Sequence, residues 1–295
     1  MPQLLVLDGK DDDVRFFDAT TRKLVKRVKV GAKPTAIALA PNGRIAYVAN
    51  GESGDLSILD VIRMTEVQRV DLDPVRAPVG LASTPDGTRL LVACAEMKSL
   101  YAFETRTNKV AAFSQPLPDV PGAITVARIG SVAFTPLKAS GKVVAFDPRT
   151  LQAYRTLDVP REPAGLDTTP DGRWLLVACR GANQLAVVST SDATLAFTVP
   201  VGPSPVRVAG LKNGMALVAT HGTNGVDLVS LDERKVIQTI ICGAKPIDVC
   251  GGRGDRVAYV ASEVNRTISV VDLEKRKIQD TLEAGAMPEA LAFRA

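Results

Sequence analysis

Histidine is nearly absent from this chain of 295 residues, which has a single one, His221. A histidine-rich metal site, a haem or copper site and a catalytic couple built on two histidines are therefore disfavoured. The sequence also lacks a Gly-x-Ser-x-Gly elbow, a phosphate-binding P-loop and a His-Glu-x-x-His motif, so these common catalytic signatures are missing. A Ser/His/Asp arrangement scattered along the chain stays open. We expect neither a metal nor a cofactor.

Aromatic residues make up only 4% of the chain, which disfavours nucleic-acid binding because single strands are held by base stacking. No apolar run is long enough for a transmembrane helix, so we expect no membrane contact. The net charge of +4 is mild and favours solubility. Basic residues gather at expected turns and are interpreted as a solvated rim that protects outer strands, with a polyanion-binding surface as the alternative: Arg22, Lys23, Arg106, Lys109, Arg234, Lys235, Lys275 and Arg276.

The chain has four cysteines, none in a C-x-x-C motif: Cys94, Cys179, Cys242 and Cys250. Cys94 and Cys179 hold the same place in two repeats, roughly 15 Å apart on a ring, which exceeds the limit of about 7 Å for a disulfide. The absence of a plausible pair favours a reducing compartment. The opening segment MPQLLVLDGKDDD has no basic stretch followed by a long apolar one, unlike a signal peptide. We expect a cytoplasmic protein; the alternative is export with the signal peptide removed.

A repeat of about 42 residues is the dominant feature of the sequence. Gly31 to Leu72 contains a Gly/Pro corner, an apolar stretch, a Pro-Asn-Gly turn and three further strand-like stretches, which is the pattern of a four-stranded propeller blade. The proline that opens each first strand sets the register in all seven copies: Pro34, Pro78, Pro121, Pro163, Pro205, Pro246 and Pro288. The tight turn after the first strand is lost in the third repeat, near Arg128 to Gly130.

The length and the two ends agree with that count. Seven blades of about 42 residues need about 294 residues, and the chain has 295. After Pro288 only one strand remains, whereas residues 3–30 supply three strands without a first one. The sequence therefore predicts an all-β, seven-bladed propeller of four-stranded antiparallel blades, a single domain over residues 1–295. Its last blade is completed by both termini, which leaves no open sheet edge at the junction.

The AYVAN and PNG pattern, with the G-x-x-P corner and the closing SILD or SVVD strand, resembles the YVTN family of seven-bladed β-propellers. The likeness covers essentially the whole chain. That family includes surface-layer and periplasmic proteins, with distant relatives that resemble lactonases and nucleic-acid binders. The resemblance implies the fold, and the fold alone implies no function.

Ligands of such folds are expected at one face of the ring, which we call the channel mouth. It consists of the connections between blades and the loops between second and third strands. On the first strands, the second residue after the proline is small in five blades but charged in two, as Arg207 and Asp248. A structural interpretation of these two charged residues is an ion pair that joins blades five and six. Asp167, two residues deeper in the first strand of blade four, is a third charged exception.

Blades five to seven gather the residues that point to a site. Carboxylates that crowd together raise one another's pKa, which prepares a general acid or base. The candidate catalytic residues are Glu263, Glu289, Asp248 and His221. The candidate ligand-binding residues are Arg207, Asp8, Asp11, Asn50, Cys94, Cys179 and Asn224. For the Asp11 to Asp13 run and for His221, the alternative is an ordinary solvated loop.

Two functions remain open at the channel mouth. The first is binding of a small molecule or a protein partner without chemistry. The second is an enzyme that uses carboxylate acid–base chemistry on an amine-bearing or lactone substrate, lactonase-like or amine–aldehyde condensing by fold analogy. Nucleic-acid binding is a weaker third alternative, and we expect a monomer.

Overall fold

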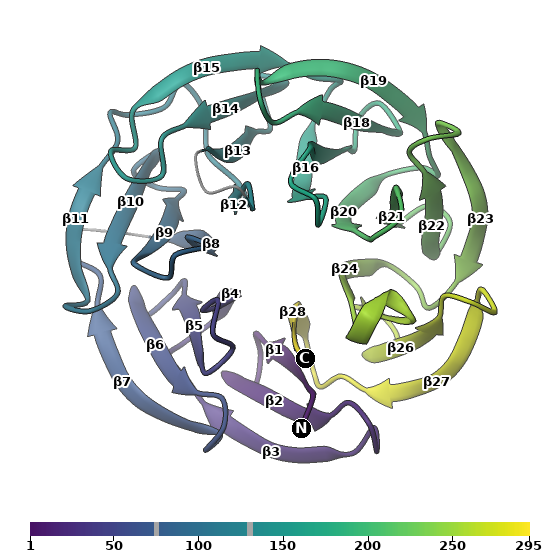
Figure 1. Ribbon diagram of the computed structural model, residues 1–295. Helices are drawn as coiled ribbons and strands as arrows, with labels where there is room; N and C mark the ends of the chain where they lie inside the picture. The colour runs from purple at the N-terminus through teal and green to yellow at the C-terminus, as the bar shows by residue number, and fades with distance from the viewer. Residues whose placement is uncertain (74–76, 129–131) are drawn as a thin grey trace.

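The computed structural model describes residues 1–73, 77–128 and 132–295, and shows seven four-stranded sheets around a central channel (Figure 1). Apolar and β-branched runs such as IAYVAN form the strands, because such side chains pack well on a pleated surface. Two expectations from the sequence lie outside the described residues: Arg76 as a residue of the channel mouth, and most of the irregular turn after Arg128.

The first three blades follow the predicted order from the channel outwards. Blade one contains β4 (Pro34–Leu39), β5 (Ile45–Asn50), β6 (Asp55–Asp60) and β7 (Thr65–Asp71). Blade two contains β8 (Pro78–Ser83), β9 (Arg89–Cys94), β10 (Ser99–Glu104) and β11 (Lys109–Phe113). Blade three contains β12 (Thr125–Val126), β13 (Ala133–Leu137), β14 (Lys142–Phe146) and β15 (Ala153–Asp158).

The remaining blades repeat the arrangement and close the ring. Blade four contains β16 (Pro163–Thr168), β17 (Trp174–Cys179), β18 (Gln184–Ser189) and β19 (Thr194–Pro200). Blade five contains β20 (Pro205–Gly210), β21 (Met215–Thr220), β22 (Gly225–Ser230) and β23 (Lys235–Ile241). Blade six contains β24 (Pro246–Gly251), a 3₁₀ turn (Arg253–Asp255), β25 (Val257–Ser262), β26 (Thr267–Asp272) and β27 (Lys277–Glu283). Blade seven contains β28 (Pro288–Arg294), β1 (Gln3–Asp8), β2 (Asp13–Asp18) and β3 (Leu24–Lys29).

Six of the seven opening prolines begin a strand as predicted, and blade three is the exception. There Pro121 forms only an isolated bridge with Leu137, and the first strand shrinks to β12. The sequence pattern SVAFT predicts that the second strand ends at Thr135, but β13 continues to Leu137. The sequence of this blade lacks the Pro-Asn-Gly or Pro-Asp-Gly turn that joins the first and second strands of blades one, two and four.

Burial changes from the channel to the rim in every regular blade. The second and third strands are buried on both faces, as in β5 and β6, because neighbouring blades cover them. Fourth strands such as β3 are largely exposed. The described apolar core divides into seven clusters, each shared by two adjacent blades. The ring is therefore held together by apolar packing between blades.

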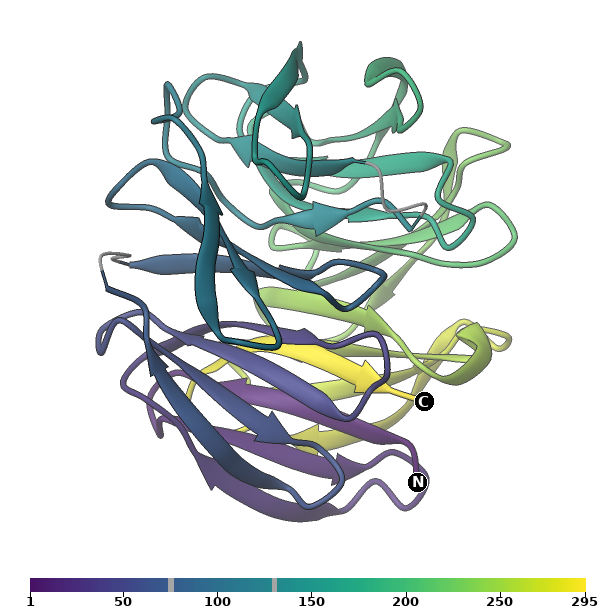
Figure 2. The same ribbon diagram turned by 60° about the vertical axis from the view of Figure 1, so that its left-hand side comes forward.

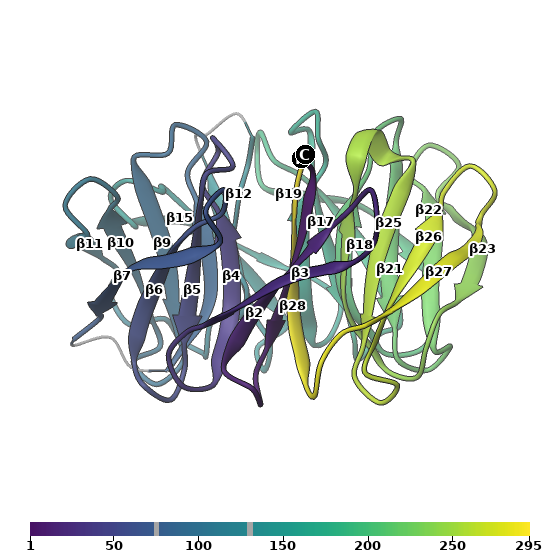
Figure 3. The same cartoon turned by 90° about the horizontal axis from the view of Figure 1, so that it is seen from below.

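Blade seven joins the two ends of the chain. β28 pairs antiparallel with β1 over its length, from Gln3 opposite Arg294 to Asp8 opposite Pro288. Figure 2 shows the two termini close together. In Figure 3 the C-terminus lies at the upper edge of the ring, so the channel mouth is the opposite, lower face.

Candidate functional site

The backbone of blade seven directs Glu289 out of the regular pairing. Leu7 lies opposite Ala290 and Asp8 opposite Pro288, so Glu289 is an extra residue without a partner on β1. A bulge of this kind re-aims a side chain. Glu289 packs beside Gly9, where an added Cβ would lie 2.8 Å from its Cγ. Glu289 is therefore held at the channel mouth beside the first residue after β1.

His221 and Glu263 occupy the same position in adjacent blades, directly after β21 and β25. Their backbones are fixed alike: His221 N donates to Ser204 O at 3.1 Å, and Glu263 N donates to Lys245 O at 3.0 Å. Arg180 follows β17 in the same place in blade four. A row of three ionisable side chains therefore crosses blades four to six at the mouth.

The electrostatics show that several candidates lie close enough to interact. Burial raises the pKa of Glu289 above its usual 4.5, the Glu263 carboxylate raises it further, and Lys33 and Arg207 oppose the shift. Burial lowers the pKa of His221, Arg180 lowers it further, and Glu263 opposes that change. His221 is thus neutral at pH 7, and its Nε2 atom is buried without a hydrogen-bond partner among the described residues.

Arg207 and Asp248 form the ion pair that the sequence suggested, with 3.7 Å between Nε and Oδ1. Their side chains are 31% and 14% exposed, so the pair lines the channel just inside the mouth. Asp248 Oδ2 also accepts a hydrogen bond from Leu291 N at 2.7 Å. Burial raises the pKa of Asp248 while Arg207 lowers it. We call Glu263, Glu289, His221, Arg207 and Asp248 the mouth cluster.

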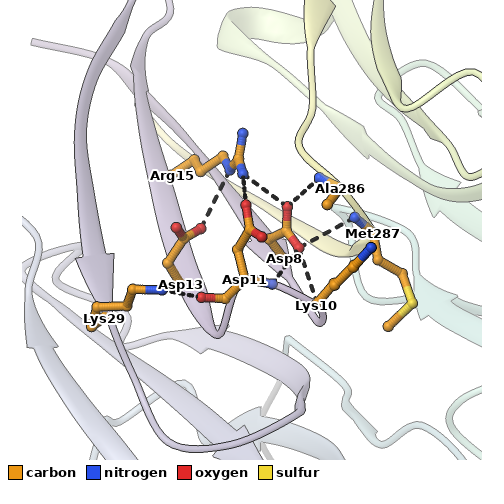
Figure 4. Close-up of polar contacts among 8 residues, drawn as sticks. All are labelled: Asp8, Lys10, Asp11, Asp13, Arg15, Lys29, Ala286 and Met287. Atoms are coloured by element: carbon orange, nitrogen blue, oxygen red, sulfur yellow. Dashed lines mark hydrogen bonds and ion pairs between the residues drawn. The ribbon is translucent and has the colours of Figure 1, made fainter.

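Asp8 and Asp11 belong to a different arrangement, which we call the seam cluster: Arg15 with Asp8, Asp11 and Asp13 (Figure 4). Asp8 is fully buried and accepts hydrogen bonds from the backbone of Lys10, Asp11, Ala286 and Met287. Asp11 Oδ2 lies 2.5 Å from Arg15 Nη2. Both carboxylates are engaged in the junction of the two chain ends, so they present little free charge to a ligand.

The other candidate ligand-binding residues are not members of the mouth cluster, although Asn224 lies beside it and its N donates to His221 O at 3.3 Å. Asn50, Cys94 and Cys179 end second strands and are fully buried. Asn50 Nδ2 donates to Ser57 Oγ at 3.0 Å, and burial raises the pKa of Cys179 to about 12. Asn224 is exposed and accepts a hydrogen bond from Lys245 N at 3.2 Å. These four residues therefore support the loops and blade contacts in this structure. The cysteines form no disulfide within the described chain.

Sequence reasoning missed Arg15, although the repeat contains a signal for it. In blades one, five, six and seven the glycine of the G-x-x-P corner packs on buried polar groups near the end of the second strand. The third-strand residue beneath that corner is then polar: Ser57, Asp227, Ser269 and Arg15. Gly202 N, for example, donates to Asp227 Oδ2 at 2.6 Å. Aligning the repeats at the corner would have placed Arg15 against Asp8.

Two sizeable cavities accompany these features. One of about 730 Å³ opens between blades three and four, and is bordered by Pro121, Pro136, Pro163, Lys138 and Arg161. The other, of about 800 Å³, lies at the opposite end of the channel and contains Asp167. Among the described residues no group of three or more His, Cys, Asp or Glu side chains is arranged to hold a metal ion, and no helix there is long and apolar enough to cross a membrane.

The geometry defines a seven-bladed β-propeller with ionisable side chains gathered at one end of its channel. The model of the YNCE-like beta-propeller family matches residues 2–293, so the chain belongs to that family. This confirms the resemblance to a propeller of YVTN-type repeats. The match spans nearly the whole ring.

Known proteins similar to this chain share the fold at low identity. Antigen Lp49 of Leptospira interrogans is 24% identical over 188 residues, which are 61% of this chain and 41% of that antigen. A functionally unknown protein from Desulfotomaculum acetoxidans superposes with a TM-score of 0.87 at 13% identity, covering 99% of this chain and 98% of that one. Hydrazine synthase of Kuenenia stuttgartiensis gives 0.77 at 19% identity, covering 90% of both chains. At these identities the structural likeness shows the fold alone.

Proposed function

We propose that the protein binds a small molecule carrying a cationic amine at the channel mouth, with Glu289 and Glu263 as the groups that receive it. The observation that supports this most directly is the pair of carboxylates from adjacent blades. Glu289 is partly buried, its pKa is raised by burial and by Glu263, and neither residue has an ion-pair partner among the described residues. A bound cation would relieve the repulsion between them.

His221 and Arg207 add selectivity to such a site. Neutral His221 offers a nitrogen atom with no partner inside the described chain, which could bond a polar group of the ligand. Arg207 forms an ion pair with Asp248. It therefore borders the site on the side of the channel without adding an unpaired positive charge. The combination fits an amine with a second polar group better than a bare metal ion.

A thermal-shift screen tests this proposal, since a ligand that binds only the folded state raises the melting temperature. We expect an amine at about 100 times its dissociation constant to stabilise the protein by about 2.7 kcal/mol, an increase of roughly 5 °C. Glu289→Gln and Glu263→Gln should abolish the shift. Glu283→Gln, an exposed glutamate on β27, is the matched control. Equal shifts in all four proteins, or no shift with any amine, would overturn the proposal.

A second candidate is acid–base catalysis at the same place on an amine-bearing or lactone substrate. The observation that favours it is the raised pKa of Glu289 near the neutral imidazole of His221, since a carboxyl with such a pKa is suited to proton transfer. Turnover of amine–aldehyde pairs or lactones, lost in Glu289→Gln, would support it. Binding without turnover would support ligand binding as the function and would contradict catalysis.

A further inference from the structure

The end of the channel opposite the mouth holds a second site, which we call the distal cavity. It has a volume of about 800 Å³ and is lined by the far ends of the first strands of blades seven, one, two, three and four. No residue of the mouth cluster belongs to its lining. Cavities of this size accommodate small organic ligands.

Asp167 is the acidic side chain among the described residues that line this cavity. It is the fourth residue after its opening proline, a position that is uncharged in the other blades: Ala38, Ala82, Thr125, Ala209, Cys250 and Ala292. Its oxygens accept hydrogen bonds from Thr168 N at 2.8 Å and Gly210 N at 2.9 Å. These two bonds hold the carboxylate in a fixed position at the wall.

The charge of Asp167 is uncompensated at short range, unlike that of Asp248. Asp248 has Arg207 at 3.7 Å, whereas no cationic group among the described residues lies within ion-pair distance of Asp167. Arg128 acts on Asp167 only from farther away, and burial raises the pKa of Asp167 to about 6. A partly buried carboxylate without a cationic partner is costly, and a cation placed against it would be stabilised.

Two arginines also border the distal cavity, so a simple cation does not complement it. Arg294 is engaged, because its Nη1 atom donates to Met1 O at 3.1 Å and to Gln3 Oε1 at 3.2 Å. Arg128 is exposed and has no hydrogen-bond or ion-pair partner among the described residues. Its guanidinium is therefore available for a bidentate contact with a carboxylate.

Apolar side chains line part of the wall between these charges. Leu39, Val126 and Phe293 contribute side chains to the lining. Ser83 also lines the cavity, and its buried Oγ atom has no hydrogen-bond partner within the described residues. The arrangement combines an anionic group, a cationic group, an unpartnered hydroxyl and apolar surface. An amino acid carries the complementary groups: an ammonium group, a carboxylate and a side chain.

We propose that the distal cavity binds a small zwitterionic amino compound, with its ammonium group at Asp167 and its carboxylate at Arg128. A ligand with only a positive charge would meet the unpaired Arg128, and one with only a negative charge would meet Asp167. A zwitterion satisfies both groups and places its side chain on the apolar wall. This site is independent of the proposed function at the mouth.

Isothermal titration calorimetry with a panel of standard L-amino acids tests this inference. We expect at least one aliphatic member, with L-leucine as the reference probe, to bind. Isoamylamine, which lacks the carboxylate, and 4-methylpentanoate, which lacks the ammonium group, should each bind at least about tenfold more weakly. The proposal would be overturned if no amino acid of the panel binds, or if either analogue binds as tightly as L-leucine.

Variants assign the binding to this cavity. Asp167→Asn and Arg128→Gln should each weaken binding at least about tenfold, whereas Arg128→Lys, which keeps the charge, should retain most of it. Glu283→Gln, at an exposed position on β27 outside both sites, should bind like the wild type. A melting temperature close to that of the wild type shows that each variant is folded. Binding that survives both Asp167→Asn and Arg128→Gln would contradict the assignment, and loss in Glu289→Gln would move the site to the mouth.

Discussion

Replacing Arg15 by methionine should destabilise the protein strongly, because the guanidinium is surrounded by three carboxylates. Its Nη2 atom lies 3.0 Å from Asp8 Oδ2 and 2.5 Å from Asp11 Oδ2, and its Nε atom lies 3.3 Å from Asp13 Oδ1. The side chains of Arg15, Asp8 and Asp13 are at most 5% exposed. Methionine keeps most of the volume but leaves two buried negative charges without their cation.

The magnitude follows from what each carboxylate retains. Breaking a buried ion pair by removing one partner costs about 3–5 kcal/mol. Asp8 keeps four backbone hydrogen bonds, which reduces its share of the loss. Asp13 has its side-chain hydrogen bond from Arg15 and would lose it. We therefore expect a loss near the lower end, about 3 kcal/mol at pH 7.

The loss should depend on pH in a defined direction. Burial already raises the pKa of Asp13 above 3.8, and Arg15 lowers it, so removing Arg15 should raise this pKa further. A carboxyl with a raised pKa in the folded state favours folding when protonated, and that contribution is lost as the pH rises through the folded-state pKa. The difference between wild type and Arg15→Met should therefore be largest near pH 7 and shrink toward pH 4.

Guanidinium chloride unfolding, followed by the fluorescence of the single tryptophan, Trp174, measures this free energy. The matched control is Arg69→Met. Arg69 makes two hydrogen bonds to Glu66, at 3.0 and 3.1 Å, but its side chain is 42% exposed, so the cost should stay below about 1 kcal/mol. Equal losses in the two variants, or a loss for Arg15→Met that does not change with pH, would refute the argument that burial makes the seam cluster important.

Two further predictions concern single positions. Gly285 has φ +124°, and an added Cβ would overlap Asp8 Oδ2 and lie 2.6 Å from Arg15 Cζ. Gly285→Ala should therefore lower the free energy of unfolding by about 2 kcal/mol or more, measured in the same unfolding assay. Gly254→Ala, where φ is also positive but no atom lies within 4 Å, should cost about 1 kcal/mol, and a similar loss in both would show that the clash is relieved. Asp167 has a pKa of about 6, above its unfolded value of 3.8, so its ionisation opposes folding as the pH rises from about 4 through 6. Asp167→Asn should consequently be more stable relative to wild type at pH 8 than at pH 4 without ligand, and a constant difference across that range would contradict the shifted pKa.

The regular part of the fold could be predicted because local chemistry fixes it. Prolines preset the first residue of each inner strand, and Pro-Asn-Gly turns set the pairing that follows. Pro34, Pro163 and Pro246 begin strands as expected. Blade three departs because its turn chemistry is missing, so no local signal defined how much of the segment after Pro121 would pair.

The sites could be predicted only in part, because contacts between blades depend on side-chain direction. The pairing of Arg207 with Asp248 followed from their shared position in adjacent blades, and Glu263 does influence Glu289. The acidic run near the N-terminus suggested an open cluster of charge, whereas Arg15 gathers it inward together with Ala286 and Met287. Those backbone donors are more than 270 positions away in the chain, so only the closed ring reveals the contact.

The pairing of β1 with β28 also determines when the protein can complete its structure during synthesis. The 280 residues from Asp8 to Pro288 must be translated before β1 meets its partner, which takes about 14–56 s at typical rates of 5–20 residues per second. Throughout that time the inner edge of β1 has no sheet partner, and Asp8 lacks the backbone donors of Ala286 and Met287. Until β28 has been synthesised, β1 therefore presents an unpaired sheet edge of the kind that favours pairing with other chains.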